Sequence, residues 1–279
     1  MPRGKVDPRP RAKRSLGQNF LVDPNIQRAV VEALELTSAD EVVEIGPGRG
    51  ALTQHLAGRV ARLVCIELDD ALAAELTARY SADESVDVVH ADFLRTGRDD
   101  VGPLGPDFKI VGNLPYNRTS PMLFRILSAA WRPALAVLMV QREVADRIVA
   151  PPGTKTYGAL SVGTRVVAEV DRVFNVSPGA FRPAPDVHSS VIRLRPHRPP
   201  RLSPAEEEAT RTLTRAAFAR RRKQFQRVLR DAPEYRLTPD RIEALERQLG
   251  VDLSARPETF APAQFVALAR ALGEATRER

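Results

Sequence analysis

The sequence predicts an α/β protein followed by a smaller, all-helical domain, and three observations support this prediction. Short apolar, β-branched runs alternate with helical patterns between residues 42 and 150, as they do in a parallel sheet covered by helices. The first of these runs leads into the glycine-rich stretch Val42–Gly50, which reads V-V-E-I-G-P-G-R-G. Prolines then cluster at residues 196–204 and only helical patterns follow them, which indicates a domain boundary.

The stretch Val42–Gly50 predicts a strand, a glycine loop and a helix start, in that order. Glycine lets such a loop turn without Cβ atoms and leaves bare backbone beside the positive end of the following helix. The spacing E-x-G-x-G-x-G differs from the dinucleotide fingerprint G-x-G-x-x-G. It resembles the first motif of the Rossmann-like S-adenosylmethionine (SAM) methyltransferases. This resemblance implies that Glu44, Gly46 and Gly48 lie at a SAM site, and the alternative is a tight connection without a ligand.

The composition bounds the class of protein. With 279 residues, of which 43% are hydrophobic and 28% charged, the chain is long enough for one large domain and a small one, as in ordinary globular proteins. Cys65 is the only cysteine, so a disulfide framework is excluded and a reducing, cytoplasmic compartment is expected. No apolar run approaches the roughly 18 residues of a membrane span, and the N-terminus lacks an apolar signal core.

The net charge of +7 is concentrated in two segments. Residues 1–14 carry +5, residues 209–230 carry +8, and the rest of the chain carries −6. Such segregation favours a polyanionic partner. The alternative is that an arginine-rich proteome places Arg on solvated faces, because only five of the 42 basic residues are Lys. Residues 1–14 show no periodicity and are predicted to form a flexible basic arm.

The pattern of apolar residues predicts the other elements. After the strand that begins at Val42, strands are expected at Arg62–Leu68, Val86–His90, Phe108–Gly112, Ala134–Gln141, Arg165–Val176 and Val187–Leu194. Helices are expected at Pro24–Leu36, Ala71–Tyr80, Pro121–Ala130, Arg142–Ala150, Tyr157–Thr164, Pro204–Leu229, Pro239–Leu249 and Pro262–Glu274. The predicted domains are the arm at 1–14, an α/β domain at 15–198 whose sheet is closed by an antiparallel hairpin, and a helical domain at 199–279.

Two carboxylates stand at strand ends where a nucleoside would bind. Glu67 ends the second strand about 20 positions beyond the glycine loop, with Leu68 beside it in the predicted site, and it can accept hydrogen bonds from both ribose hydroxyls. Asp92 and Phe93 follow the third strand, where a carboxylate can accept adenine amino hydrogens while an aromatic ring covers the base face. The alternative for this pair is a helix-capping Asp beside a core Phe.

The run Asn113-Leu114-Pro115-Tyr116 follows the fourth strand and is the most specific chemical signal in the chain. Methyl transfer to an exocyclic amine is an in-line displacement that is difficult because the nitrogen lone pair is delocalised into the purine. The Asn113 amide oxygen and the Leu114 carbonyl can accept both amino hydrogens, which favours a tetrahedral nitrogen. Pro115 fixes φ, and Tyr116 can stack on a flipped-out base. Phe181 is predicted to complete the base pocket, with a core position as the alternative.

A basic run lies on the predicted helix Pro204–Leu229. It consists of Arg220, Arg221, Arg222 and Lys223. Such a run is usually a solvated helix face, but beside a base-modifying domain phosphate contact is the better interpretation. We therefore predict that these four residues bind RNA.

Taken in order, the motifs resemble those of the ribosomal RNA adenine dimethyltransferase family. They are Gln18-Asn19-Phe20-Leu21, Glu44-x-Gly46-x-Gly48, Glu67, Asp92, Asn113-Leu114-Pro115-Tyr116, Tyr157-Gly158, Phe181-Arg182-Pro183 and Arg221-Arg222-Lys223, and they cover nearly the whole chain. The resemblance implies a Rossmann-like, SAM-dependent methyltransferase domain with a seven-stranded mixed sheet. It also implies that Gln18, Asn19 and Leu21 contact SAM, Leu21 through its backbone. No metal is expected.

The resemblance further implies a reaction and a substrate. The reaction is N6,N6-dimethylation of two adjacent adenosines in the 3′-terminal hairpin loop of small-subunit (16S) rRNA. The partner is a pre-ribosomal 30S-like particle, the protein is expected to be a monomer, and a role in late ribosome biogenesis follows. Leu114 resembles the small-subunit branch, whereas the macrolide-resistance branch, which modifies large-subunit RNA, more often has Ile there.

Two further alternatives remain at the level of sequence. DNA adenine methyltransferases also use an N/D-x-P-Y motif, but they usually have Pro at the position of Leu114 and a separate target-recognition domain. An RNA-binding assembly factor that no longer needs catalysis comes from a different class of function. Intact Glu67, Asp92 and Asn113 argue against lost activity but not against such a second role.

Overall fold

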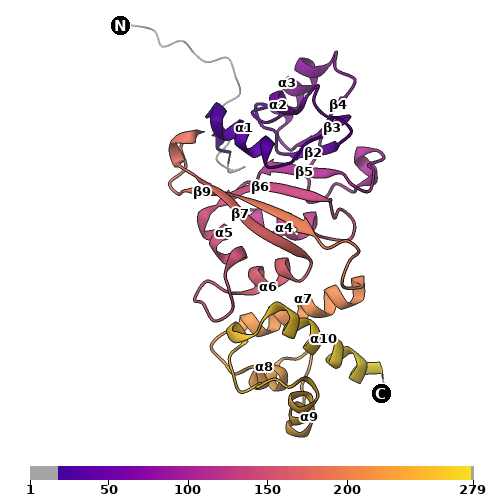
Figure 1. The fold of residues 1–279 in the computed structure, drawn as a ribbon, viewed down its shortest axis with the longest axis vertical. Coiled ribbons are helices and arrows are strands. Elements are labelled where there is room, and N and C mark those ends of the chain that lie inside the picture. The colour runs from indigo at the N-terminus through magenta and orange to yellow at the C-terminus, as the bar shows by residue number, and fades with distance from the viewer. Residues whose placement is uncertain (1–17, 278–279) are drawn as a thin grey trace. The chain divides into compact units, whose positions relative to one another are not determined.

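The computed structural model describes residues 18–277 of the chain, and Figure 1 shows its ribbon. The predicted basic arm at 1–14 lies outside the described residues. The strands are β1 (Phe20–Leu21), β2 (Glu41–Ile45), β3 (Arg62–Glu67), β4 (Val86–His90), β5 (Lys109–Asn113), β6 (Leu135–Gln141), β7 (Ala168–Val176), β8 (Phe181–Arg182) and β9 (Ser189–Pro196). The helices are α1 (Pro24–Glu32), α2 (Thr53–Leu56), α3 (Asp70–Tyr80), α4 (Thr119–Ile126), α5 (Arg142–Val149), α6 (Ala159–Arg165), α7 (Pro204–Ala219), α8 (Phe225–Asp231), α9 (Pro239–Leu249) and α10 (Pro262–Arg277).

Seven strands form one sheet in the order β4-β3-β2-β5-β6-β9-β7. The neighbours from β4 to β6 all run parallel. This confirms the predicted α/β class and the seven-stranded sheet. The chain moves outward from β2 to β4 and then returns to β5 on the other side of β2, so the strand order reverses between β2 and β5. In sheets of this kind ligands bind at the carboxyl ends of the strands beside that reversal.

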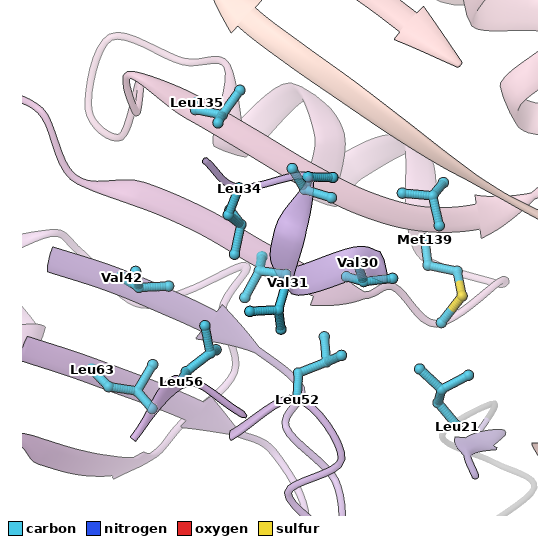
Figure 2. Close-up of a cluster of buried hydrophobic side chains, with 14 of the residues drawn as sticks. Leu21, Val30, Val31, Leu34, Val42, Leu52, Leu56, Leu63, Leu135 and Met139 are labelled. Carbon is cyan, nitrogen blue, oxygen red and sulfur yellow. The ribbon is translucent and has the colours of Figure 1, made fainter. Parts of the chain in front are cut away.

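Four of the parallel strands, β2, β3, β5 and β6, are largely buried, which explains their apolar runs. The fifth, β4, lies at the edge of the sheet and is partly exposed. In β2 only Glu41 is partly exposed. Figure 2 shows Val42 of β2 and Leu63 of β3 in one apolar cluster with Val31 of α1 and with Leu34, which follows that helix, all of them buried. This packing covers one face of the sheet and fixes the directions in which the strand ends point.

Local capping explains where two of the helices begin. Asp23 accepts a hydrogen bond from the Asn25 N–H at 2.8 Å, and Pro24 occupies the first turn of α1, where its missing N–H costs nothing. Asp69 accepts from the Ala71 N–H at 3.1 Å and caps α3. The helical run expected directly after the glycine loop contracts to the single turn α2, because the chain forms turns from Gly48 to Leu52.

The chain divides into two compact units. One consists of the described residues up to Arg142 together with Arg172–Arg193, and the other of Glu143–Asp171 and the residues from Leu194 onward. The second unit has its own apolar core, in which the Tyr157 hydroxyl donates to the Phe260 carbonyl at 2.7 Å. It therefore includes α5 and α6, which the sequence analysis assigns to the first domain. The boundary near residue 198 remains a prediction about which part folds on its own.

The predicted helix Pro204–Leu229 is wrong, because α7 ends at Ala219 and α8 begins at Phe225. The Phe225 N–H donates to the Ala255 carbonyl at 2.9 Å, and the Gln226 N–H donates to the Leu253 carbonyl at 2.8 Å. These bonds satisfy donors that open a new helix, and Phe225 is fully buried. The basic run at residues 220–223 therefore lies in a turn and not on a helix.

Two glycines predict opposite effects of the same substitution on stability. A Cβ at Gly112 would lie 2.7 Å from the Ile45 backbone oxygen on the paired strand, so Gly112→Ala should lower the free energy of unfolding by about 1–3 kcal/mol. A Cβ at Gly273, within α10, would meet nothing within 4 Å. Gly273→Ala should therefore raise the free energy of unfolding by about 0.5–1 kcal/mol. Urea unfolding of both variants checks the signs, and equal midpoints would contradict the steric argument.

Candidate active site

A cavity of about 420 Å³ lies at the carboxyl ends of β2, β3, β4 and β5. Its lining comes from residues 18–21, 44–49, 51–52, 66–68, 91–93 and 113–118, with Met122. Every residue that the sequence analysis assigns to cofactor binding lines this cavity, and so do the predicted catalytic residues 113–116. Six separate segments therefore meet where the topology predicts a ligand, in a volume suited to a small molecule.

The glycine loop presents bare backbone to the cavity. Gly46, Gly48 and Gly50 have φ of +64°, +59° and +78°, a left-handed conformation that side chains rarely adopt. A Cβ at Gly46 would meet nothing within 4 Å, so this stretch of backbone faces open space. A Cβ at Gly48 would lie 3.1 Å from the Phe20 ring. The loop can therefore approach a ligand closely, as the predicted SAM site requires.

The Glu67 carboxylate is held in one orientation beside this loop. One oxygen accepts from the Gly48 N–H at 2.9 Å and the other from the Asp69 N–H at 2.8 Å. Burial raises the pKa of Glu67, while the backbone donors lower it. Each carboxylate oxygen has a second lone pair. The arrangement fits recognition of a ribose diol, with one carboxylate oriented by the loop itself.

The predicted adenine contacts combine a polar and an apolar part. Asp92 accepts from the Leu94 N–H at 3.0 Å and from the Arg118 guanidinium at 3.1 Å. Leu68 is 39% exposed, so it offers an apolar surface to a ring. Phe93 lines the cavity but is nearly buried, with its ring centroid 5.0 Å from that of Trp131. Phe93 thus takes the core position that the sequence left as the alternative and also lines the cavity, and its contact with an adenine ring stays a prediction.

The Asn113 amide is fixed by the segment that precedes α1. Its Nδ2 donates to the Asn19 backbone carbonyl at 2.9 Å. Because only the amino end of an amide can donate to a carbonyl, the Asn113 side-chain oxygen is the acceptor that remains. Asn113 ends β5 and lines the cavity. The residue is therefore positioned to accept a hydrogen bond from an amine.

Residues 18–21 are fastened at every position. Gln18 donates to the Asp69 carboxylate at 3.1 Å, and the Leu21 carbonyl accepts from the buried Gln27 amide at 3.1 Å. The Arg49 guanidinium lies 4.7 Å from the centre of the Phe20 ring. These contacts hold the segment along the cavity. Sequence analysis places Gln18, Asn19 and Leu21 here only by resemblance, because nothing in the segment itself predicts its partners.

Phe181 does not line the cavity. Its side chain is fully buried in the core cluster that contains Leu21. The two residues are partners in the antiparallel pair that β1 and β8 form. The structure thus gives Phe181 the core position that the sequence left as the alternative, and direct contact with a base stays a prediction.

The Tyr116 ring is anchored through its hydroxyl, which shares a hydrogen bond with Ser189 Oγ at 2.6 Å. Burial raises the pKa of Tyr116, so the hydroxyl is neutral at neutral pH. The Leu114 N–H donates to the Met139 carbonyl at 3.0 Å, and the Pro115 carbonyl accepts from the Thr119 hydroxyl at 3.1 Å. These hydrogen bonds hold residues 114–116 in place. Sequence reasoning missed Ser189, which carries no local signal for this partnership.

Glu44 is a buried carboxyl that lines the cavity. It is 2% exposed and accepts from the Thr53 hydroxyl at 2.7 Å. Burial, assisted by the nearby charge of Glu67, raises the pKa of Glu44 to about 7. The Thr53 bond links the end of β2 to α2 across the glycine loop. Glu44 therefore holds the two ends of the glycine loop together through Thr53.

The basic run is divided between held and exposed side chains. Arg221 pairs with Glu258 at 2.5 Å and donates to the Thr154 carbonyl at 3.1 Å. Arg222 and Lys223 are exposed, and Arg220 is partly exposed.

Within residues 18–277, no group of three or more His, Cys, Asp or Glu side chains could hold a metal ion. No helix in the same range is long and apolar enough to cross a membrane.

A family model described as "Ribosomal RNA adenine dimethylase" matches residues 9–273. The chain belongs to this family. It is a SAM-dependent enzyme that dimethylates adenines in rRNA, and the glycine loop, Glu67 and Asp92 fit the cofactor.

Two curated relatives are similar to this family member over nearly its whole length, and both are named "Ribosomal RNA small subunit methyltransferase A". The one from Geobacter metallireducens is 38% identical over 264 residues, which cover 94% of this chain and 96% of the relative. The one from Bordetella pertussis is 41% identical over 261 residues, which cover 94% of each.

Two solved structures share the fold. A dimethyladenosine transferase from Plasmodium falciparum superposes with a TM-score of 0.76 at 24% identity, covering 92% of this chain and 98% of that one. The 23S rRNA methyltransferase ErmE superposes with a TM-score of 0.68 at 30% identity, covering 91% of this chain and 100% of that one. The predicted mixed sheet and C-terminal helices are therefore those of rRNA adenine methyltransferases.

The raised pKa of Glu44 predicts a pH effect on stability. An unfolded Glu has a pKa near 4.5 and folded Glu44 one of about 7, so folding favours the protonated form. The contribution of Glu44 to the free energy of unfolding is therefore fully present below pH 4.5. As the pH rises to 7 this contribution is lost, and the free energy of unfolding falls by about 3 kcal/mol in total. Glu44→Gln keeps an acceptor for Thr53 but removes the titration.

The check is urea unfolding of both proteins at several pH values. Between pH 4.5 and 7 the wild-type free energy of unfolding should fall relative to that of Glu44→Gln. If the two curves stay parallel across this range, the buried carboxyl does not titrate as described.

Proposed function

We propose that this protein transfers methyl groups from SAM to N6 of two adjacent adenosines in the 3′-terminal hairpin loop of small-subunit (16S) rRNA. The products are N6,N6-dimethyladenosines. The names of the two curated relatives, which match at 38% and 41% identity, support the small-subunit substrate. The observation that carries the proposal is the hydrogen bond from Asn113 to the Asn19 carbonyl, because it leaves an amide oxygen to receive an exocyclic amine.

The proposed chemistry requires the amine nitrogen to become tetrahedral before it attacks. The Asn113 oxygen would accept one amino hydrogen and the Leu114 carbonyl the other, so the nitrogen lone pair is freed from the ring. Tyr116, held by Ser189, would stack on the extruded adenine and fix its plane. When bound, SAM supplies an electrophilic methyl group on a sulfonium. The contribution of this chain is alignment and acceptance of hydrogen bonds.

The cofactor would be held along the carboxyl edge of the sheet. Glu67 would accept from the ribose hydroxyls, and Asp92 from the adenine amino group, with Leu68 and Phe93 beside the ring. Gly46 and Gly48 would face the ligand with backbone alone. The remaining contacts would come from Gln18, Asn19 and the Leu21 backbone, and Glu44 would support the loop.

A large-subunit substrate is the second candidate, because ErmE is a 23S rRNA methyltransferase at 30% identity over 91% of this chain. Leu114 and the two small-subunit relatives favour the first. The proposed partner is a pre-ribosomal 30S-like particle in the cytoplasm, bound by a monomer. Binding of the protein to this particle is also compatible with a role in checking late subunit assembly, and such a role does not exclude catalysis.

Substrate discrimination tests the proposed function. The protein is incubated with methyl-labelled SAM and, separately, with undermethylated small subunits, large subunits and duplex DNA. Label should enter only the small subunits and should be recovered as dimethyladenosine. Asn113→Ala should abolish most of the single-turnover rate while SAM affinity changes much less, because the amide acts mainly in the transition state. If label entered the large subunits alone, the result would favour large-subunit rRNA as the substrate.

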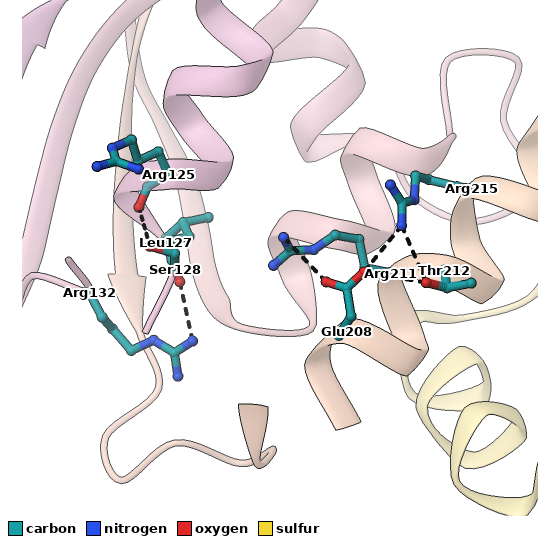
Figure 3. A network of polar contacts seen from close by, with 8 residues as sticks. All are labelled: Arg125, Leu127, Ser128, Arg132, Glu208, Arg211, Thr212 and Arg215. Carbon is teal, nitrogen blue, oxygen red and sulfur yellow. Dashed lines mark hydrogen bonds and ion pairs between the residues drawn. The ribbon is translucent and has the colours of Figure 1, made fainter. Parts of the chain in front are cut away.

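We further propose that the basic turn at residues 220–223 contacts RNA phosphates. Much of the positive charge in residues 209–230 is already paired. Figure 3 shows Glu208 between Arg211 and Arg215 of α7, at 3.7 and 3.2 Å. Arg221 is held by Glu258. The phosphate contacts would therefore fall mainly to the other three side chains of the turn, of which Arg222 and Lys223 are exposed.

Salt dependence tests this assignment. Replacing Arg222 and Lys223 with Ala should weaken particle binding, leave SAM affinity unchanged, and reduce the slope of log affinity against log salt by about one to two. The matched control replaces Arg211 and Arg215, which removes the same charge from paired positions and should change the slope less. If the variant that lacks Arg222 and Lys223 is folded and its slope is unaltered, the turn does not contact phosphates and is only a solvated surface.

A further inference from the structure

We propose that Arg118 is a positioning residue that orients the Asp92 carboxylate toward the amino group of the cofactor adenine. This inference rests on the proposed function, in which Asp92 accepts that amino group. It adds a residue which neither the motif pattern nor the chemistry of methyl transfer assigns. The consequence is discrimination between 6-amino and 6-oxo purine ligands.

The geometry places Arg118 and Asp92 at the same cavity. A guanidinium nitrogen of Arg118 lies 3.1 Å from Asp92 Oδ2, and the Leu94 N–H lies 3.0 Å from Asp92 Oδ1. Both Asp92 and Arg118 line the cavity, with side chains 19% and 39% exposed. The carboxylate is therefore gripped at both oxygens, and its rotation about the side-chain bond is restricted.

The chemistry of the two partners determines what a ligand must offer. A carboxylate accepts about four hydrogen bonds, and a guanidinium only donates. Once the Leu94 N–H and Arg118 have taken one position on each oxygen, the remaining positions can only accept. An amino group satisfies them, whereas a carbonyl oxygen at the same place would face a negatively charged acceptor. Arg118 thus helps to hold this acceptor surface without touching the ligand amino group itself.

The backbone of Arg118 ties this grip to the catalytic loop. Its N–H donates to the Pro115 carbonyl at 3.1 Å, and its carbonyl accepts from the Met122 N–H at 3.2 Å in the first turn of α4. Arg118 is therefore hydrogen-bonded to the loop that carries Pro115 and Tyr116. The Arg118–Asp92 pair is a direct side-chain link between the proposed adenine pocket and the proposed base pocket.

The test is a binding cycle with two ligands and no turnover. Calorimetry measures the affinity of the full chain for S-adenosyl-L-homocysteine and for S-inosyl-L-homocysteine, in which oxygen replaces the amino group. Arg118→Ala should weaken the adenosyl ligand about 2–5-fold, the range of partly exposed ion pairs. It should leave the inosyl ligand unchanged. Asp92→Ala should weaken the adenosyl ligand roughly tenfold or more, and adding Arg118→Ala should then have no further effect.

The controls separate positioning from general electrostatics and from misfolding. Arg95, an exposed arginine three residues beyond Asp92, is replaced by Ala as the charge-matched control and should leave both affinities unchanged. Arg118→Gln serves as a second variant if Arg118→Ala does not fold. Equal weakening of both ligands, no change, or tighter binding of the adenosyl ligand would each overturn the role of Arg118. If Asp92→Ala also leaves binding unchanged, the proposed cofactor placement fails instead.

Discussion

The hydrogen bond between the Asn113 amide and the Asn19 carbonyl is the constraint on which the rest of the site depends. It joins residues 94 positions apart in sequence and decides which end of the amide can accept. An amide that could turn over would offer a donor as often as an acceptor and would lose its use in orienting an amine. The site therefore needs residues 18–21 to be rigid, although they form only a two-residue strand.

That rigidity comes from outside the segment. The short strand β1 pairs with β8, so that Leu21 lies opposite Phe181. Phe181 is fully buried, and a buried aromatic side chain contributes several kcal/mol to the packing around it. The loop after β7 thus serves the site by anchoring the segment that orients Asn113. A residue can be essential to a reaction in this way without facing the substrate.

Sequence reasoning succeeded where the signal is local. The bounds predicted for β4 and α9 from the pattern of apolar residues and prolines agree with the structure. The residues that it predicts for cofactor binding all line one cavity, because parallel strands bring their carboxyl ends together. It failed where distant chain segments decide, as at Phe225, whose N–H bonds the Ala255 carbonyl and so breaks the long helix. The hydrogen bond between Tyr116 and Ser189 and the ion pair between Asp92 and Arg118 could not be predicted either, because the partners are distant in sequence.

The proposed function separates two tasks, because the cavity would hold a positively charged cofactor while basic side chains elsewhere would contact RNA phosphates. Glu44, Glu67 and Asp92 all line the cavity, and the ligand proposed for it carries a positive sulfonium. Carboxylates near the ligand favour that cation, and Arg49 and Arg118 line the cavity as well. In the proposed function the RNA phosphates would be contacted by exposed basic side chains such as Arg222 and Lys223. Asp92 pairs with Arg118 at the cavity, and the ligand group proposed for it is a neutral amine, which needs orientation more than it needs charge.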